Sequence, residues 1–296
     1  ISGQNGYHTY RIPALIVTKK GTVLAFCEAR KNSKSDTGDI DLVLKRSRDG
    51  GKTWSEQQVV WDDDANTCGN PCPVVDETTG TIWLLLTHNL GTDNERDIKL
   101  KTAKGTRTVW VCQSTDDGKN WTKPVEITAT TKDPSWAWYA TGPGVGIQIQ
   151  HGPHQGRLVI PCDHSYDDPK GDLRGMPVGF GSHAIYSDDH GMNWKRGAAI
   201  HPKVNECQVV ELADAKNTLL MDMRSYAGRN RRTQSFSHDG GEGWTEPEAK
   251  EPLIEPVCQA SILRYTWPDN GDKSRIIFSN PADEKRRRNF TVRLSY

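Results

Sequence analysis

The chain has 296 residues, a length that allows one large domain or two small ones. Its 38 basic and 38 acidic residues cancel, which excludes the broad positive field of a nucleic-acid- or membrane-binding surface. No apolar run approaches the roughly 20 residues of a membrane span. The 34% hydrophobic content, with 27 Gly and 10 Trp, favours many short strands and tight turns over a helical bundle.

The first predicted elements are two strands, residues 14–17 and 22–26, joined by a turn of sequence K-K-G. Arg11 then lies near the start of one strand and Arg30 just past the end of its partner, so antiparallel pairing brings both to the same end of the sheet. Asp36 follows in a polar loop. Two guanidinium groups and a carboxylic acid suit an anionic ligand that needs proton transfer. The stretch alone is equally compatible with surface arginines and a loop aspartate.

Farther along the chain, four octapeptides share the pattern S-x-D-x-G-x-(T/N/G)-W. They begin at Ser47, Ser114, Ser187 and Ser237, and strand-like runs over residues 58–61 and 125–128 follow the first two. In such a motif the Asp binds nearby amides, the Gly adopts the left-handed conformation, and the Trp folds back and buries its ring. These motifs therefore predict structural turns, not catalytic groups.

Four copies in register, each between strands, indicate a repeated unit of roughly 50 to 70 residues arranged radially, a β-propeller. No linker or low-complexity tract divides the chain, so a single domain over residues 1–296 is expected, without a helix longer than a turn or two. Seven cysteines cannot all pair, and four of them lie in apolar or strand-like runs typical of buried thiols: Cys27, Cys112, Cys162 and Cys207. The histidines are scattered, so neither a metal nor a cofactor is expected.

The motif Y-R-I-P together with the four octapeptides, known as Asp boxes, resembles the exo-sialidase (neuraminidase) family of six-bladed β-propellers. The resemblance covers essentially the whole chain. It implies an all-β propeller of antiparallel sheets with the last blade incomplete here, and hydrolysis of terminal α-linked sialic acid with retention. Its ligand would be a sialylated glycoconjugate or a free sialoside, with no nucleic acid and no membrane span.

The resemblance implies that three arginines hold the sugar carboxylate, because guanidinium offers planar bidentate donors and keeps its charge. Arg11 in Y-R-I-P, Arg224 in L-L-M-D-M-R-S and Arg287 match these positions. Arg30 in E-x-R would line the pocket near C4 of the sugar, and Glu28 would brace the arginines.

Three of these matches are less specific. Arg287 stands two residues before the Asn of R-x-N-x-T-V-R, and its neighbours Arg286 and Arg288 remain alternatives. Asn70, in G-N-P-C-P, and Glu95, in T-D-N-E-R, match loops that reach the sugar in relatives.

Asp36 matches the general acid/base, which would protonate the leaving oxygen and then activate water. Asp39 and Asp41 are rivals by residue type, but they are expected to start the next strand. Glu206, in N-E-C-Q, matches the carboxylate that pairs with a tyrosine nucleophile; a neutral phenol avoids the repulsion that a carboxylate would meet at this anomeric carbon. Taken singly, Glu206 could be a solvent-facing strand residue and Arg224 an ordinary salt-bridge partner.

Three aromatic residues crowd one segment and fit either a platform for the aglycone or a packed plug: Trp136, Trp138 and Tyr139. The chain begins without Met or a signal peptide, which predicts a processed or trimmed end at Ile1. Its last residues resemble the start of another Asp box, and the strand that carries the nucleophilic tyrosine in relatives is not found.

Three explanations fit this ending: a remainder on a second chain, a truncated protein, or a natural remnant that binds sugar without cleaving it. A missing piece is favoured, because an open propeller would leave an unpaired strand edge. A second chain could then supply the missing strands. The alternatives in function are a non-hydrolytic sialic-acid-binding propeller, a trans-sialidase and a protein-interaction platform. The sequence does not set the compartment, though an extracellular or periplasmic one is favoured.

Overall fold

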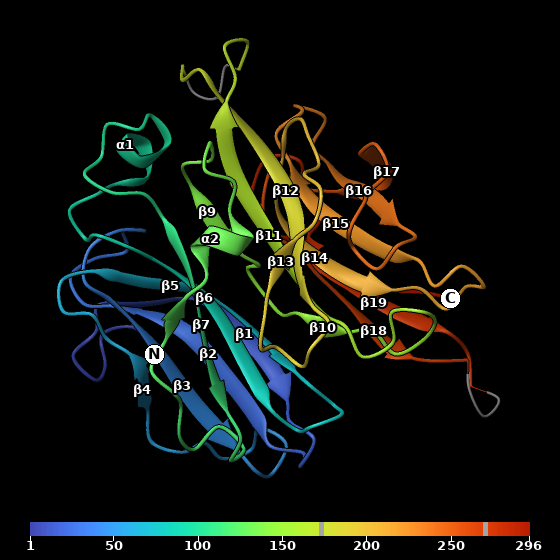
Figure 1. Ribbon diagram of the computed structural model, residues 1–296, viewed down its shortest axis with the longest axis horizontal. Coiled ribbons are helices and arrows are strands. Elements are labelled where there is room, and N and C mark those ends of the chain that lie inside the picture. Colours follow the sequence, from blue (N-terminus) through green and yellow to red (C-terminus); the bar gives the residue numbers. More distant parts are fainter. Residues whose placement is uncertain (172–174, 269–271) are drawn as a thin grey trace. The chain divides into compact units, whose positions relative to one another are not determined.

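The computed structural model describes residues 1–171, 175–268 and 272–296, and nearly all regular structure in them is β-strand (Figure 1). Contacts divide the chain into two units, Ile1–Gly146 with His164–Gly179, and Ile147–Asp163 with Phe180–Tyr296. The expectation of one domain over residues 1–296 stays a prediction.

The first unit contains two consecutive four-stranded groups of antiparallel strands, joined by a single parallel pairing of Ile40 with Thr67. Their strands are β1 (Thr9–Val17), β2 (Val23–Arg30), β3 (Ile40–Ser47) and β4 (Gln58–Trp61), then β5 (Thr67–Val75), β6 (Ile82–Asn89), β7 (Thr108–Ser114) and β8 (Val125–Glu126). The only helices among the described residues are one turn long, α1 (Glu95–Lys99) and α2 (Thr128–Thr131). The run expected over residues 125–128 is therefore shorter, because Thr128 begins α2.

Two further strand groups lie wholly in the second unit. They are β14 (Val204–Glu211), β15 (Leu219–Ser225), β16 (Arg231–Ser237) and β17 (Glu248–Ile254), then β18 (Ser261–Thr266), β19 (Arg275–Pro281) and β20 (Phe290–Ser295). A fifth group has strands in both units: β9 (Tyr139–Thr141), β10 (Ile147–Gln148), β11 (Leu158–Asp167), β12 (Val178–Ser187) and β13 (Lys195–Arg196). The antiparallel all-β class is confirmed, and the described residues form five such groups.

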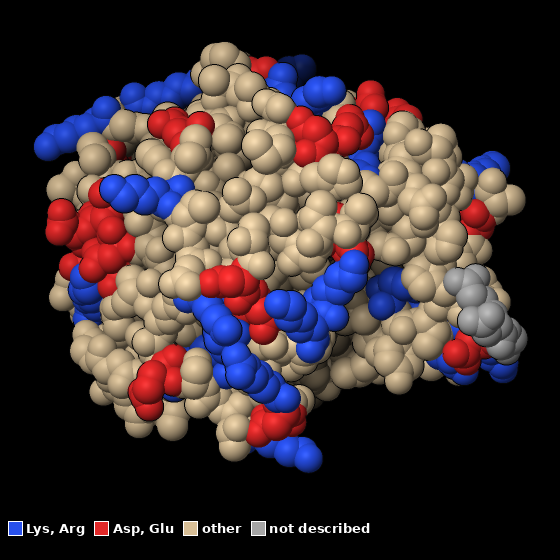
Figure 2. Space-filling model, turned by 60° about the horizontal axis from the view of Figure 1, so that its bottom comes forward, with Lys and Arg blue, Asp and Glu red and all other residues tan. Residues whose placement is uncertain are grey.

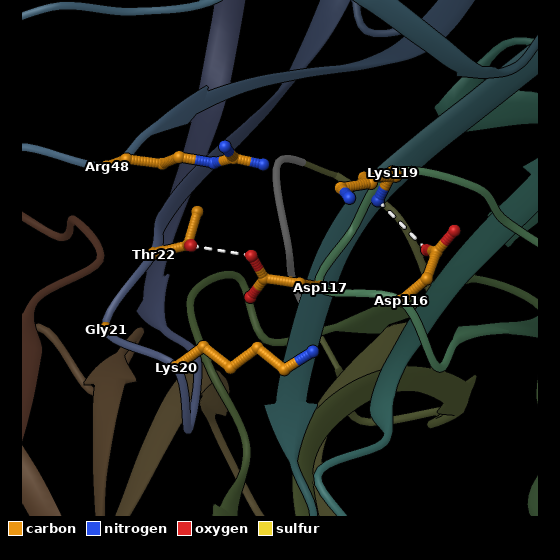
Figure 3. A pocket seen from close by; sticks show the side chains of 7 residues that line it. All are labelled: Lys20, Gly21, Thr22, Arg48, Asp116, Asp117 and Lys119. Carbon is orange, nitrogen blue, oxygen red and sulfur yellow. Dashed lines mark hydrogen bonds between the residues drawn. The ribbon is translucent and has the colours of Figure 1, made fainter.

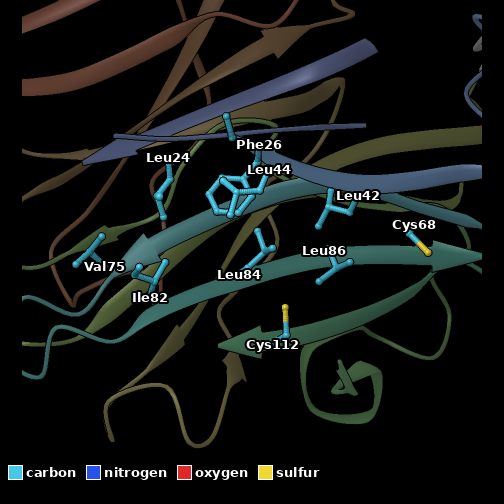
Figure 4. Packing of buried hydrophobic residues seen from close by; sticks show 11 residues of the cluster. Leu24, Phe26, Leu42, Leu44, Cys68, Val75, Ile82, Leu84, Leu86 and Cys112 are labelled. Carbon is cyan, nitrogen blue, oxygen red and sulfur yellow. The ribbon is translucent and has the colours of Figure 1, made fainter. Parts of the chain in front are cut away.

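Each unit has its own apolar core between neighbouring strand groups. In the first unit, side chains of β2 and β3 pack against those of β5, β6 and β7 (Figure 4). Leu24, Leu42 and Leu84 are fully buried there, each contributing roughly 1.5–3 kcal/mol. In the second unit, Val210 and Leu220 pack against Ile262 and Phe278 of the last group. The alternating apolar pattern of the strands thus holds these neighbouring groups together within each unit.

All four Asp boxes form the same tight turn. In the second box, Ser114 donates to Asp116 at 2.9 Å, and the amide of Gly118 donates to Ser114 at 2.9 Å. Gly118 has a φ of +75° and a Cβ there would approach Leu24 to 3.0 Å, so the turn requires glycine. The structural role is confirmed, with one correction: the ring of Trp54 is 39% exposed, because its indole donates to Gly51 at the turn surface.

Acid is expected to weaken these turns. Hydrogen bonds from the Asn120 amide and side chain and from Ser114 lower the pKa of Asp116 to about 2. Because this pKa is below that of the unfolded chain, the stability it contributes is present above about pH 4 and is lost as the pH falls toward 2. Urea unfolding between pH 5 and 2 should show a shallower pH slope for Asp116→Asn, which still accepts the amide bonds but takes up no proton. Equal pH slopes for both proteins would contradict a contribution of Asp116 to the acid sensitivity.

Candidate active site

A compact charged cluster forms in the first unit, at the end of the sheet where β1 begins and β2 ends. Arg11 of β1 pairs in register with Glu28 of β2, and Arg30 is the last residue of β2. A bulge separates Arg11 from Ala14, and within it Ile12 has a φ of +53°. This backbone is strained for a β-branched residue, and bulges redirect neighbouring side chains. The Y-R-I-P motif therefore encodes the direction of Arg11.

Asp36 links the two arginines. Its Oδ1 lies 2.9 Å from Nη1 of Arg11 and 2.8 Å from Nη2 of Arg30. Arg30 also donates to the carbonyls of Lys34 and Ser35 at 2.6 and 2.7 Å, which fixes the loop that carries Asp36. The Asp36 side chain is 53% exposed, whereas Arg30 is 2% exposed. The cluster thus presents a solvent-accessible carboxyl group over a buried cation.

Glu28 braces this cluster from beneath. Its buried carboxylate accepts from Nε of Arg30 at 3.0 Å and from the amide of Asn70 at 2.9 Å. A Cβ at Gly69 would lie 2.6 Å from Glu28, so only glycine admits the carboxylate there. Burial disfavours the charged form of Arg30, but the charges and hydrogen bonds of Glu28 and Asp36 outweigh it and raise its pKa.

One weaker prediction needs correction, and a second stays a prediction. Asn70 lies inside β5, not in a loop, and it is 8% exposed at a second bulge with a φ of +52°. Its side chain accepts from Nη2 of the buried Arg107 at 2.6 Å. Glu95 begins α1, a single turn within the connection between β6 and β7, where its carboxylate contacts Lys99 one turn later. The Asn70 carboxamide is therefore buried inside a strand, whereas Glu95 does lie in a connection between strands.

The rivals of Asp36 have other partners. Asp39 forms an ion pair with Lys31 at 2.9 Å. Asp41 is buried in β3, where Tyr7 donates to it and Lys31 lies 3.4 Å away. Neither contacts an arginine of the cluster in the described residues, so Asp36 is the aspartate that the geometry favours.

A second charged cluster lies in the other unit, on β14 and β15. Nη1 of Arg224 donates to Glu206 at 2.6 Å, and its guanidinium lies 4.9 Å from the ring centre of Tyr226. Glu206 sits at a third bulge, between Val204 and Cys207. Both charged side chains keep partial exposure, 14% and 21%. Within the described residues Glu206 is thus partly exposed and paired with Arg224. This pairing is also what a solvent-facing strand glutamate and an ordinary salt-bridge arginine would form.

Arg287 is exposed, and in the described residues it forms no ion pair with Glu206. Its charge nevertheless acts on Cys258: burial raises the pKa of that thiol, and Arg287 is the first of the cations that oppose the rise, followed by Arg224. Arg288 instead pairs with Asp283 at 2.5 Å. The choice of Arg287 over Arg286 and Arg288 stays a prediction from the motif.

Several residues near these clusters escaped prediction. Arg107 is 1% exposed and joins Asn70 to Thr87, and Tyr226 lies against Phe180 at 5.1 Å between ring centres. The sequence signal for Arg107 is only a basic residue next to a strand.

The aromatic segment 136–139 is buried, with Tyr139 at 0% exposure, so it packs as a plug and offers no open platform.

Charges of both signs are mixed on the face drawn in Figure 2, in keeping with local clusters instead of a broad field. Among the described residues, no group of three or more His, Cys, Asp and Glu side chains could hold a metal ion. The helices found there are also too short to cross a membrane.

Taken together, the strand groups, the Asp-box turns and the arginine–carboxylate clusters define an all-β repeat protein built to hold charged side chains at strand ends. The sequence profile of the BNR repeat-like domain matches residues 21–296. The chain belongs to the BNR-repeat sialidase family.

Relatives and solved structures agree with this assignment. The sialidase of Bacteroides fragilis is 33% identical over 99% of this chain and 54% of its own, and the exo-alpha-sialidase of Aspergillus fumigatus is 33% identical over 98% and 68%. The structure of the Hadza microbial sialidase Hz136 superposes with a TM-score of 0.85 at 30% identity, over 99% of this chain and 57% of that one. The chain thus has the fold of the sialidase β-propellers, and it spans about half the length of the bacterial relative.

Proposed function

We propose that this chain carries the catalytic propeller of an exo-sialidase, which hydrolyses terminal α-linked sialic acid from glycoconjugates. The observation that carries the proposal is the cluster of Arg11, Arg30 and Asp36 braced by Glu28. It combines fixed positive charge for an anionic sugar with an accessible carboxyl group for proton transfer. The family resemblance supports the same roles.

In the proposed reaction, Arg11 binds the sugar carboxylate, and Arg30 lines the pocket near C4. Asp36 protonates the leaving oxygen while the tyrosine nucleophile bonds to the anomeric carbon, and Asp36 then takes a proton from the water that displaces the tyrosine; the two displacements together give retention. Arg224 and Arg287 are assigned to the same carboxylate by their motifs. Glu206 would accept the proton of a tyrosine nucleophile, and no tyrosine of residues 1–296 is assigned to that role.

Asn70 and Glu95 keep only an indirect part in this proposal. Asn70 holds Arg107 and the Glu28 carboxylate in place, and Glu95 contacts Lys99. The comparisons give no support to a second polypeptide as a partner. No cofactor enters the proposed chemistry.

The test is turnover of a fluorogenic aryl α-sialoside by the full-length protein, with its Arg11→Met variant alongside. Loss of a charge-assisted bidentate contact should lower kcat/KM by about 10²-fold or more. Arg48→Met, which removes an exposed arginine of the first Asp box far from the cluster, is the matched control and should keep its activity. Absence of turnover by the unaltered protein, or equal rates for Arg11→Met, would reject the proposal.

Mass analysis of the product separates the alternatives. Free sialic acid identifies hydrolysis, whereas a sialylated acceptor or an anhydro sugar identifies transfer. Saturable sialoside binding without any product identifies a binding propeller.

A further inference from the structure

A cavity of about 350 Å³ lies in the first unit, at the opposite end of β1 and β2 from the arginine cluster (Figure 3). It is lined by the β1–β2 turn and by residues of the first two Asp boxes: Lys20, Gly21, Thr22, Arg48, Asp116, Asp117 and Lys119. The length of β2 separates it from Arg30 by about 25 Å. It is therefore distinct from the proposed catalytic cluster.

Both carboxylates of the cavity are already engaged by the protein. Asp117 accepts from the hydroxyls of Thr18 and Thr22 at 2.5 and 2.6 Å and pairs with Arg46 at 3.2 Å. Asp116 accepts the amides within its own Asp box. Asp117 is thus paired with a cation, and Asp116 is held by its own Asp box before any ligand enters.

The three cations of the cavity are not engaged in this way. Lys20, Arg48 and Lys119 are exposed, and none of them forms an ion pair in the part of the chain that the structure describes. Figure 3 shows the side chains of Arg48 and Lys20 extending from neighbouring turns toward Asp117. The cavity therefore offers an excess of positive charge, carried by side chains from three neighbouring turns.

We propose that this cavity binds a phosphate or sulfate ester of a small polyhydroxylated molecule, such as a sugar. A guanidinium grips two oxygens of such a group, and the two ammonium groups neutralise its charge. The volume is that of a small-molecule site, about 300–1,000 Å³. The remaining lone pairs of Asp116 and Asp117 can accept hydroxyls of the body of the ligand. Because the site is open and screened, affinity on the order of 1 mM is expected.

Calorimetric titration of the whole chain with glucose 6-phosphate, glucose 6-sulfate, inorganic phosphate and glucose tests the proposal. Both esters should bind saturably, inorganic phosphate more weakly, and glucose not at all. The combined variant Lys20→Gln, Arg48→Gln, Lys119→Gln should weaken ester binding by at least about tenfold. Arg11→Met is the matched control, because phosphate could also reach the arginine cluster, and it should bind the esters normally.

Amide chemical shifts of the unaltered protein give an independent readout, since added ester should move the signals of Gly21 and Thr22. Absence of saturable ester binding, unchanged affinity in the combined variant, loss of binding in Arg11→Met, or shifts confined to other residues would each overturn the proposal. Inorganic phosphate binding as tightly as the esters would overturn the part that assigns a sugar-like body.

Discussion

Replacing Asp36 by alanine is expected to lower kcat for sialoside cleavage by about 10²–10⁴-fold, the usual contribution of a general acid/base. The side chain is half-exposed, and two guanidinium groups fix its position at 2.8 and 2.9 Å. A ligand carboxylate that bound Arg11 would compete with Asp36 for the same cation, which would free the carboxyl group for the leaving oxygen. KM should change much less than kcat, because this role matters mainly in the transition state.

The leaving group provides the sharper measurement. An aryl sialoside leaves readily without a proton, whereas a sialyllactose needs one, so Asp36→Ala should lose more activity toward sialyllactose. Both kinetic constants should be measured for both substrates in the full-length protein. Asp39→Asn is the matched control: it alters an aspartate three residues away that pairs with Lys31 and should change rates by no more than about twofold. Equal losses on the two substrates would rule out proton donation by Asp36.

The hairpin, the Asp-box turns and the all-β class could be predicted because each depends on residues close together in the sequence. The turn after β1 needs only its K-K-G sequence, and each Asp box satisfies its own hydrogen bonds. Arg11, Arg30 and Asp36 were predicted to share one sheet end, and antiparallel pairing does bring them together.

Contacts between distant segments could not be predicted in this way. Asn70 was expected in a loop because G-N-P-C-P matches a loop that reaches the sugar in relatives, yet it lies at a bulge within β5. Its partner Arg107 is 37 residues away, directly before β7 of the same strand group, and no local pattern marks this contact. The positive φ of Ile12 is likewise unexpected for a β-branched residue and is tolerated only because the surrounding strands hold it.

The largest effect on stability is expected for Arg232→Met in the second unit. Arg232 is fully buried, with Nε 2.6 Å from Asp222 and Nη1 2.8 Å from Glu255, both also buried. Removing the cation leaves two buried carboxylates without their counter-charge, which should lower the free energy of unfolding by about 3–5 kcal/mol. That is a large part of the roughly 5–15 kcal/mol typical of a domain.

The pH dependence identifies the cause. Burial already raises the pKa values of Asp222 and Glu255, and Arg232 opposes this rise. Without Arg232 both values should rise further, so the folded variant would bind more protons than its unfolded chain. Its stability should then fall as the pH rises above about 4, relative to the unaltered protein. Urea unfolding at pH 5 and pH 8 measures this difference.

Two further variants complete the experiment. Arg231→Met, on the same strand but at the surface, should change stability far less. Adding Asp222→Asn and Glu255→Gln to Arg232→Met should recover much of the loss, because neutral amides can remain buried without a counter-charge. A small loss of unfolding free energy that is the same at both pH values would show that these ion pairs do not stabilise the unit.

The same variant should also affect ligand binding. Glu255 accepts a hydrogen bond from the amide of Ser225 at 2.7 Å, and Ser225 is next to Arg224. Arg232→Met should therefore misplace Arg224 and weaken sialoside binding under conditions where the unit is still folded.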